Sequence, residues 1–385
     1  MSLATDDLEQ PVSLLSVERA IAELRRGGIV VIRDDQGGAA LAVAAENVNQ
    51  ESQTRLNAMA SAAPVLVLTA ARARALDIEI PPHLQASVQE SAVVALSLPA
   101  GVPAEIVADI ADPRADPKLA ARHLSRPVPP HADAATRAAI ELAKLARLLP
   151  AVLLGPLAAD RNRRLPGWAH ASDLVYVEAS AIAAYEELSA RTLKAVAEAR
   201  VPLDGAENSR VIAWRPNDGG KEHLAIVIGE INATAPVLVR LHSECFTGDL
   251  VGSLRCDCGE QLRGAIAEIA KAGAGVLLYM AQEGRGIGLV NKLRAYQLQD
   301  QGFDTIDANE QLGFDADERL YRPAAVILAR MGIKQVRLMT NNPEKLEQLE
   351  RHGITVVERV RHVFPANGHN ENYLRTKAER SGHLM

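Results

Sequence analysis

The chain has 385 residues and a formal net charge of −6, from 48 acidic and 42 basic side chains. This length predicts two domains, and an apolar share of 48% excludes disorder as the general state. Aromatic residues make up only 3%, which together with the mild acidity argues against nucleic-acid binding. We expect no export signal, and the sequence contains no uninterrupted apolar window of about 18 residues. We therefore expect a cytoplasmic protein with no membrane association.

The first half of the chain alternates helical patterns with short β-branched runs. Residues 16–28 predict a helix that starts at a Ser16 cap and stops at glycine, and GIVVIRD at 28–34 predicts a buried strand. Further strands are expected at 63–70 and 91–98, and further helices at 133–150 and 179–199.

The second half has the same mixed character. Strands are expected at 223–230, 235–243, 275–282, 335–340 and 354–360, and helices at 259–273, 288–302, 322–332 and 343–353. A turn signal at 202–205 marks the domain boundary. We expect an α/β (α+β) fold with two domains, 1–200 and 201–385, each a mixed sheet with packed helices.

The three cysteines lie close together, in the pattern C-x10-C-x-C at Cys245, Cys256 and Cys258. Such a cluster is no disulfide framework, and three thiolates this close repel one another unless a cation lies between them. Zinc is the usual metal for sulfur ligands, and three protein ligands with one open position form a catalytic zinc site. The alternatives are a structural site closed by His242 or His223, or three unrelated thiols.

The residues before Cys245 favour the catalytic alternative. Arg240, His242 and Glu244 alternate along the predicted strand, so they share one face just before the first ligand. A structural zinc knuckle needs no such polar row. Polar residues at a strand end are also often no more than solvent-facing.

A glycine-rich turn, Glu283-Gly284-Arg285-Gly286-Ile287-Gly288, follows a predicted strand and precedes a predicted helix. Glycines there let backbone N–H groups approach an anion, and the helix N-terminus adds partial positive charge. Most such turns are merely tight connections, but the presence of Arg285 favours a loop that faces phosphate.

Two further segments carry charged residues beside predicted helices. In 315–319, Asp317 is a candidate proton acceptor with Arg319 beside it, although acidic residues before a helix are commonly caps. In 340–345, Thr340 ends a strand and Lys345 lies in the first turn of the next helix. The helix dipole disfavours a lysine there, so an anion partner would explain it; a solvated lysine is the alternative.

Together, the segments RLHSECFTGDLVGSLRCDCGEQL, EGRGIGLVNKLRAYQLQDQG, DTIDANEQLGFDADER and LMTNNPEKLEQLERHGI closely resemble GTP cyclohydrolase II, the enzyme that opens riboflavin biosynthesis. The resemblance covers most of residues 200 to 385, with the blocks in order and at family spacing. It implies that Cys245, Cys256 and Cys258 hold a catalytic zinc. It further implies GTP-binding positions at Arg240, His242, Ser243, Glu244, Gln261, Glu283, Gly284, Arg285, Thr305, Thr340 and Lys345.

The resemblance also implies roles in catalysis. Asp317 corresponds to a proton acceptor, Arg319 to a nucleophile, and Tyr296 to a residue near the reacting base. The reaction opens the guanine imidazole ring, with loss of formate and pyrophosphate, and a zinc-bound water suits the first part. Arg285, Lys345 and Mg²⁺ on the phosphates suit the second. Because a guanidinium stays protonated far above neutral pH, stabilisation of the α-phosphate by Arg319 is an equally good account.

Residues 14 to about 200 resemble 3,4-dihydroxy-2-butanone 4-phosphate synthase, which is often fused before the cyclohydrolase. After Asp34-Asp35, however, the acidic stretch of that family is replaced by Gln36-Gly37-Gly38-Ala39-Ala40-Leu41, and two further family blocks are missing. The lost carboxylates would hold Mg²⁺ and deprotonate the sugar phosphate. We therefore expect an inactive half that persists as a scaffold or dimer element.

Four functions remain open from the sequence. The first is a GTP cyclohydrolase II, for which the family suggests a homodimer. The others are a bifunctional enzyme that also makes 3,4-dihydroxy-2-butanone 4-phosphate, a non-catalytic GTP-binding zinc module, and a related cyclohydrolase that stops before formate loss.

Overall fold

A computed structural model describes residues 10–78, 92–115, 127–129, 133–363 and 368. The chain forms two compact units: Met1–Glu186 with Val290–Glu318, and Glu187–Leu289 with Arg319–Met385. The mixed α/β class expected from the sequence is confirmed, because each unit has a seven-stranded sheet with packed helices. No helix in the described part of the chain has the length and apolar composition needed to cross a membrane.

The first unit contains a sheet in the order β5-β4-β3-β6-β2-β1-β7. Its strands are β1 (Val30–Arg33), β2 (Ala39–Ala44), β3 (Val65–Thr69), β4 (Val93–Ser97), β5 (Pro127–Val128), β6 (Ala151–Pro156) and β7 (Val175–Glu178). Only the β1–β7 pair is parallel.

The helices of the first unit come from two stretches of chain. Those from the N-terminal stretch are α1 (Gln10–Arg25), α2 (Gln50–Met59), α3 (Ala70–Ala75), α5 (Ala104–Ala111), α7 (Asp133–Leu145), α8 (Ala159–Asn162), α9 (Gly167–Ala171) and α10 (Ala179–Arg191), with the short helix η2 (Ala45–Asn47). The later stretch adds α12 (Leu289–Asp300) and α13 (Thr305–Gln311), and α13 packs against α3. Helix α7 contacts strands β1, β2, β3, β4 and β6.

The second unit contains a sheet in the order β14-β13-β11-β12-β10-β9-β8. Its strands are β8 (Lys194–Arg200), β9 (Ser209–Arg215), β10 (His223–Ile228), β11 (Val237–Ser243), β12 (Gly275–Met280), β13 (Gln335–Met339) and β14 (Thr355–Val360). The four strands β14, β13, β11 and β12 run parallel, and β10, β9 and β8 continue the sheet in antiparallel pairs.

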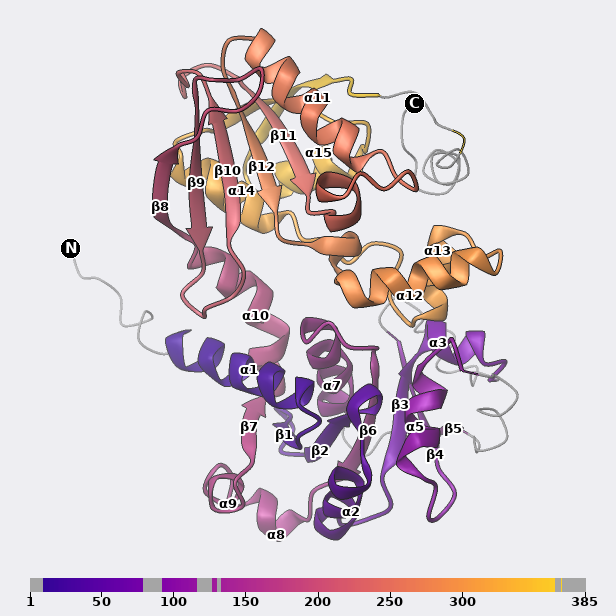
Figure 1. Cartoon of the computed structure of the whole chain (residues 1–385). Coiled ribbons are helices and arrows are strands. Elements are labelled where there is room, and N and C mark those ends of the chain that lie inside the picture. Colours follow the sequence, from indigo (N-terminus) through magenta and orange to yellow (C-terminus); the bar gives the residue numbers. More distant parts are fainter. Residues whose placement is uncertain (1–9, 79–91, 116–126, 130–132, 364–367, 369–385) are drawn as a thin grey trace, which may run out of the picture. The chain divides into compact units, whose positions relative to one another are not determined.

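Helices cover both faces of the second sheet (Figure 1). On one face, α14 (Arg322–Arg330) and α15 (Glu344–Arg351) pack with Val239 and Leu241 of β11. On the other, α11 (Cys258–Lys271) packs with Leu238. Because strand residues alternate between faces, Arg240 and His242 continue the row of Leu238 on the α11 side.

Two local expectations were wrong. Helix α1 begins at Gln10, so Ser16 lies inside the helix rather than capping it. The stretch 179–199 is not one helix, because α10 ends at Arg191 and β8 begins at Lys194. The sequence KAVAEAR is compatible with a helix, but its pairing with β9 makes it an edge strand whose residues are all exposed.

Candidate functional site

The polar signals of the second half gather at one edge of the second sheet. Strands β12, β11 and β13 are parallel neighbours, so their carboxyl ends lie at the same edge. Cys245 follows β11, Glu283 follows β12 and Thr340 follows β13. In parallel α/β sheets this edge is where ligands bind, which makes it the candidate site.

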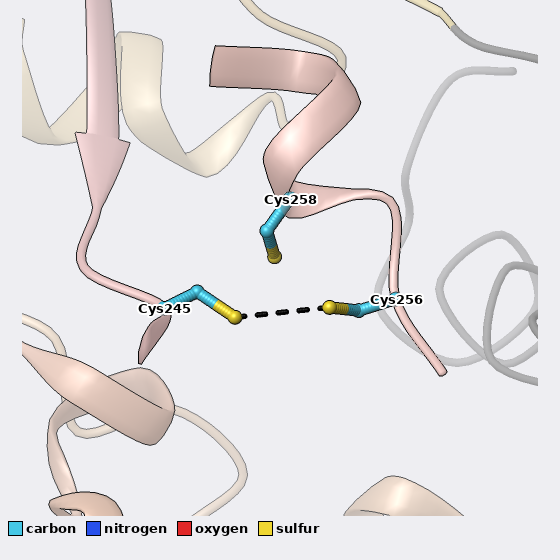
Figure 2. Close-up of side chains that lie close together, drawn as sticks. All are labelled: Cys245, Cys256 and Cys258. Carbon is cyan, nitrogen blue, oxygen red and sulfur yellow. Dashed lines mark hydrogen bonds between the residues drawn. The ribbon is translucent and has the colours of Figure 1, made fainter. Parts of the chain in front are cut away.

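The three cysteine sulfurs point toward one another (Figure 2). Cys245 comes from the end of β11, Cys256 from a loop and Cys258 from the first turn of α11. All three Sγ atoms lie within 4.8 Å of one another, and those of Cys245 and Cys256 are 3.7 Å apart. The cluster is therefore compatible with a metal site, as the spacing of the cysteines predicted.

At Gly248 the backbone passes very close to the three cysteine side chains. A Cβ atom at this position would lie 2.8 Å from Cys256 Sγ, 2.9 Å from Cys258 Cβ and 3.1 Å from Cys245 Sγ. The Gly248 N–H also donates to Cys245 Sγ at 3.3 Å. Any side chain at position 248 would displace the sulfurs, so only glycine fits there. The N–H directed at Cys245 Sγ also favours the thiolate form of that cysteine.

The surroundings of the cysteines oppose ionisation of the free thiols. The interaction with Cys245, followed by burial, raises the pKa of Cys256 to about 11, although Cys258 acts in the opposite direction. The neighbouring sulfurs of Cys245 and Cys256, followed by burial, raise the pKa of Cys258 well above its usual range. A bound cation reverses this balance, because it stabilises all three thiolates at once.

Neither histidine considered as a fourth ligand joins the sulfurs. Among the described residues, the metal-binding group consists of the three cysteines alone. His242 Nε2 lies 3.0 Å from Asp249 Oδ1, and His223 Nδ1 accepts a hydrogen bond from the Ala281 N–H at 3.1 Å. Within the described residues, the cluster therefore offers three protein ligands, and neither histidine closes it.

His242 is buried with one ring nitrogen unsatisfied. Its ring stacks on Tyr279, with centroids 5.6 Å apart. Burial lowers the pKa of His242, although Asp249 favours the charged form. A neutral ring that donates from Nε2 to Asp249 has a lone pair on Nδ1, and this buried atom has no hydrogen-bond partner among the described residues.

Arg240 lies in a buried polar network on the same strand. It donates to Met339 O at 3.0 Å and to Gln261 Oε1 at 2.5 Å, and Gln261 in turn donates to Asp257. Burial lowers the pKa of Arg240 to about 10, with Asp257 opposing the shift. Arg240 therefore remains a cation at neutral pH, fixed in place before any substrate arrives.

The other positions at this edge are also held by the protein. Lys345 lies in the first turn of α15, as expected, and its Nζ donates to Leu241 O at 2.9 Å. Ser243 accepts a hydrogen bond from Gln282 at 3.0 Å, and Thr340 accepts one from the Asn342 N–H at 3.0 Å. Glu244 donates its N–H to Met280 O at 2.9 Å.

The glycine-rich turn is built around a buried carboxylate. Glu283 accepts the Phe246 N–H at 2.6 Å and the Gly284 N–H at 3.0 Å. Gly284 and Arg285 both have left-handed backbone conformations, with φ of 64° and 60°. Because a non-glycine residue rarely adopts that conformation, Arg285 is held by its surroundings. Glu283 therefore connects this turn to the backbone beside Cys245.

The remaining predicted residues divide between the units. The Arg319 guanidinium lies 5.9 Å from the centre of the Tyr321 ring, in the second unit. Tyr296, Thr305 and Asp317 belong to the first unit, in the stretch Val290–Glu318. Their part in the site stays a prediction.

Sequence reasoning missed Asp249 as a supporting residue. Its carboxylate accepts hydrogen bonds from the Cys245 N–H and the Tyr279 hydroxyl, both at 3.0 Å, besides contacting His242. In the sequence, only its position four residues after Cys245 pointed to such a role. That signal is weak, because aspartate is common in turns.

Known proteins are similar to this chain over almost all of its length. Residues 194–361 match the family model for GTP cyclohydrolase II. A GTP cyclohydrolase-2 of Azospirillum brasilense is 55% identical over 383 residues, which cover 97% of this chain and 94% of the relative. The chain belongs to the GTP cyclohydrolase II family.

Two other relatives match smaller shares of the chain, and the first of them is much shorter than this chain. A GTP cyclohydrolase-2 of Cronobacter sakazakii is 53% identical over 193 residues, covering 50% of this chain and 98% of the relative. The riboflavin biosynthesis protein RibBA of Bacillus cereus is 45% identical over 255 residues, covering 65% of this chain and 64% of that protein. A GTP cyclohydrolase II can therefore consist of little more than the matched half, which makes the role of the first 190 or so residues a separate question.

Proposed function

We propose that this chain hydrolyses GTP to 2,5-diamino-6-ribosylamino-4(3H)-pyrimidinone 5′-phosphate, formate and pyrophosphate, the first step of riboflavin biosynthesis. The observation that carries the proposal is the group of three cysteine sulfurs at the carboxyl edge of a parallel sheet, in a member of this family.

Zinc is the metal we propose for Cys245, Cys256 and Cys258. Thiolate ligands select soft or borderline cations, and the tight fit of Gly248 shapes a small cradle around the sulfurs. Held by these three cysteines, a zinc ion would lower the pKa of a bound water and so supply the nucleophile for C8 of guanine at neutral pH.

We propose that the protein residues bind and orient GTP, taken as its magnesium complex. Arg285 and Lys345 would neutralise phosphate charge, and Arg240 is a buried cation fixed by its neighbours. His242, Ser243, Glu244, Gln261, Glu283, Gly284, Thr305 and Thr340 complete the proposed GTP-binding set. The free lone pair on His242 Nδ1 can accept a hydrogen bond from substrate or water.

Proton transfer and phosphate chemistry are assigned to Asp317, Arg319 and Tyr296. Asp317 would accept a proton, and Tyr296 would lie near the reacting base. The face of the Tyr321 ring beside Arg319 favours the charged guanidinium, which supports stabilisation of the α-phosphate over nucleophilic attack. Pyrophosphate release by Arg319→Lys without any covalent intermediate would support this choice; a trapped phosphoryl or guanylyl adduct on wild-type Arg319 would contradict it.

We propose that the first half, 1–200, has lost the butanone phosphate synthase activity. Asp34, the acid just before the altered stretch, accepts the N–H groups of Gln36 at 3.0 Å and Gly38 at 2.6 Å. Its buried carboxylate therefore closes the turn between β1 and β2. Asp34 thus has a local structural role, and the acidic residues that follow it in the butanone phosphate synthase family are replaced here by Gln36-Gly37-Gly38-Ala39-Ala40-Leu41.

One assay tests these assignments together. The purified, zinc-loaded protein is incubated with GTP, and formate, pyrophosphate and the pyrimidine product are measured; all three are expected in equal amounts. Pyrophosphate without formate would indicate an enzyme that stops earlier, and binding without products would indicate a non-catalytic module. Ribulose 5-phosphate is expected to give no butanone phosphate, and its formation would indicate a bifunctional enzyme.

We further propose that the protein is a cytoplasmic homodimer. The family resemblance supports this assembly, and light scattering of the purified protein would test it.

A further inference from the structure

The stretch Val290–Glu318 belongs to the family-matched part of the sequence, yet it packs in the first unit. This stretch carries Tyr296, Thr305 and Asp317, three of the residues proposed above for substrate and catalysis. The N-terminal half therefore supports a segment that the proposed reaction needs, and its contacts with that segment are specific.

The first contact point is near the start of the segment. Arg294 pairs with Glu46 of the N-terminal half at 2.8 Å, and the side chain of Asn291 donates to Arg147 O at 3.0 Å. Glu46 also accepts the Leu149 N–H at 2.8 Å. Arg294 and Glu46 are mostly buried, so this pair and Asn291 fix the first half of α12 to the N-terminal half.

The second contact point lies after α13. Arg72 of the N-terminal half donates to Gln311 O at 3.2 Å, and two further bonds to Ile110 O hold the guanidinium in place. Gly313, with φ of 86°, approaches so closely that a Cβ there would lie 2.9 Å from Thr69 Oγ1. The backbone of Gly313 therefore packs directly against Thr69 of the N-terminal half.

The third contact point is the turn that contains Asp317. Lys144 of α7 places its Nζ 2.8 Å from Asp315 Oδ2 and 2.7 Å from Glu318 Oε1. The Asp315 N–H donates to Glu318 at 2.9 Å, which closes the turn. The Lys144 side chain is only 11% exposed. One lysine of the N-terminal half thus holds both ends of the turn, and Asp317 lies between them.

We propose that Lys144 is a positioning residue for the cyclohydrolase reaction, because it fixes the turn 315–318 and thereby the carboxylate of Asp317. The inference rests on the proposed function for the role of Asp317. It gives the N-terminal half a specific task, since the lysine comes from the part of the chain that the shorter relatives lack.

The charges around Lys144 make its loss consequential. Asp315 and Glu318 of the turn, Glu141 of α7 and Glu186 of α10 all interact electrostatically with this lysine or with one another. Without the ammonium group, the carboxylates of Asp315 and Glu318 lose the cation that lies between them, and we expect the turn to shift as they repel each other. A displacement of about 1 Å of a reacting group can cost about 100-fold in rate.

The test compares Lys144→Met with Lys144→Arg in the full-length, zinc-loaded protein. We expect Lys144→Met to lower kcat for formate release by about 10- to 100-fold and to leave KM for GTP within about threefold. Lys144→Arg keeps the charge and is expected to restore most of kcat. Hydrogen exchange over residues 309–320 is expected to rise in Lys144→Met and to return toward the wild type in Lys144→Arg.

The matched control is Arg137→Met on the same helix, whose ion pair with Asp133 is exposed. It should leave kcat and exchange unchanged. If Lys144→Met does not fold, Glu318→Gln is the second variant. It removes the ion pair between Lys144 and Glu318, keeps the shape of the side chain and leaves the pair with Asp315, so we expect a smaller loss of kcat. Unchanged kcat and exchange in the folded variant would overturn the proposal.

Failure of the proposed function would give a different result from failure of the Lys144 proposal. A wild type that releases no formate from GTP would contradict the proposed reaction, whereas the exchange measurement would still decide whether Lys144 holds the turn.

Discussion

The two sheets of the molecule have the same number of strands in the described residues but different pairing. In the first sheet only β1 and β7 run parallel, whereas the second has four parallel strands side by side. Parallel neighbours bring their carboxyl ends to one edge, and in the second sheet that edge holds Cys245, Glu283 and Thr340.

The first sheet has a different task. In the described part of the chain, the only cluster of metal-binding side chains lies in the second unit. The polar residues of the first unit instead hold the stretch Val290–Glu318, through Glu46, Arg72 and Lys144. Under the proposal above, the first half supports this stretch, and the reaction takes place in the second half.

The largest effect is expected from Cys256→Ser, which tests where the chemistry lies. A serine hydroxyl is a poor zinc ligand at neutral pH, so we expect the variant to lose its bound zinc. The rate of formate release should then fall by about 1,000-fold or more. Metal analysis and a formate assay on the same preparation check this. A variant that has no metal and still opens the ring would contradict the metal assignment.

A smaller effect is expected from Gly248→Ala, which changes no ligand. The added methyl group would lie within 3.1 Å of atoms of all three cysteines, so the sulfurs must move. We expect zinc affinity to fall by about 10- to 100-fold, measured by competition with a chelator. Gly167→Ala is the matched control, because a Cβ there meets nothing within 4 Å. Equal zinc affinities in the two variants would show that the close fit at Gly248 does not contribute to zinc binding.

The smallest effect is expected from Glu186→Gln, which tests the charge balance of the first unit. Burial, and then the charges of Glu141 and Glu318, raise the pKa of Glu186 from 4.5 to about 8. Between these values the folded state binds a proton that the unfolded state has released, so stability falls as pH rises toward 8.

Glu186→Gln removes this pH dependence. At pH 8 we expect it to raise the free energy of unfolding by on the order of 1–3 kcal/mol, with Tm higher by roughly 2–6 °C. At pH 5 the variant and the wild type should have nearly the same Tm. Glu105→Gln, at an exposed position of the same unit, is the control. An equal gain at both pH values would contradict the assigned protonation.

Much of the second unit could be predicted because its strands are β-branched runs that end at glycine or polar residues. All five strands expected there are present as β10 to β14. The strands β2 and β6 of the first unit were missed. The sequence of β2, AALAVA, is mostly alanine, and that of β6, AVLLGP, ends in glycine and proline, all residues with little β propensity. Strand β8 was taken for helix, since only its pairing with β9 makes it a strand.

The candidate site was accessible to sequence reasoning where its residues are near one another in the chain. The three cysteines lie within 14 positions and meet in space as expected. Lys144 and Asp315 are separated by 171 positions, and a lysine in an amphipathic helix resembles any solvated charge. Contacts of this kind depend on tertiary packing, which no local pattern encodes.

The most direct test of the account is a product analysis of the full-length protein with GTP and with ribulose 5-phosphate in parallel. We predict equimolar formate, pyrophosphate and pyrimidine product from GTP, and no butanone phosphate from ribulose 5-phosphate. Butanone phosphate at a rate comparable to formate release would contradict a single site in the second sheet, and the absence of formate from GTP would contradict the proposed reaction itself.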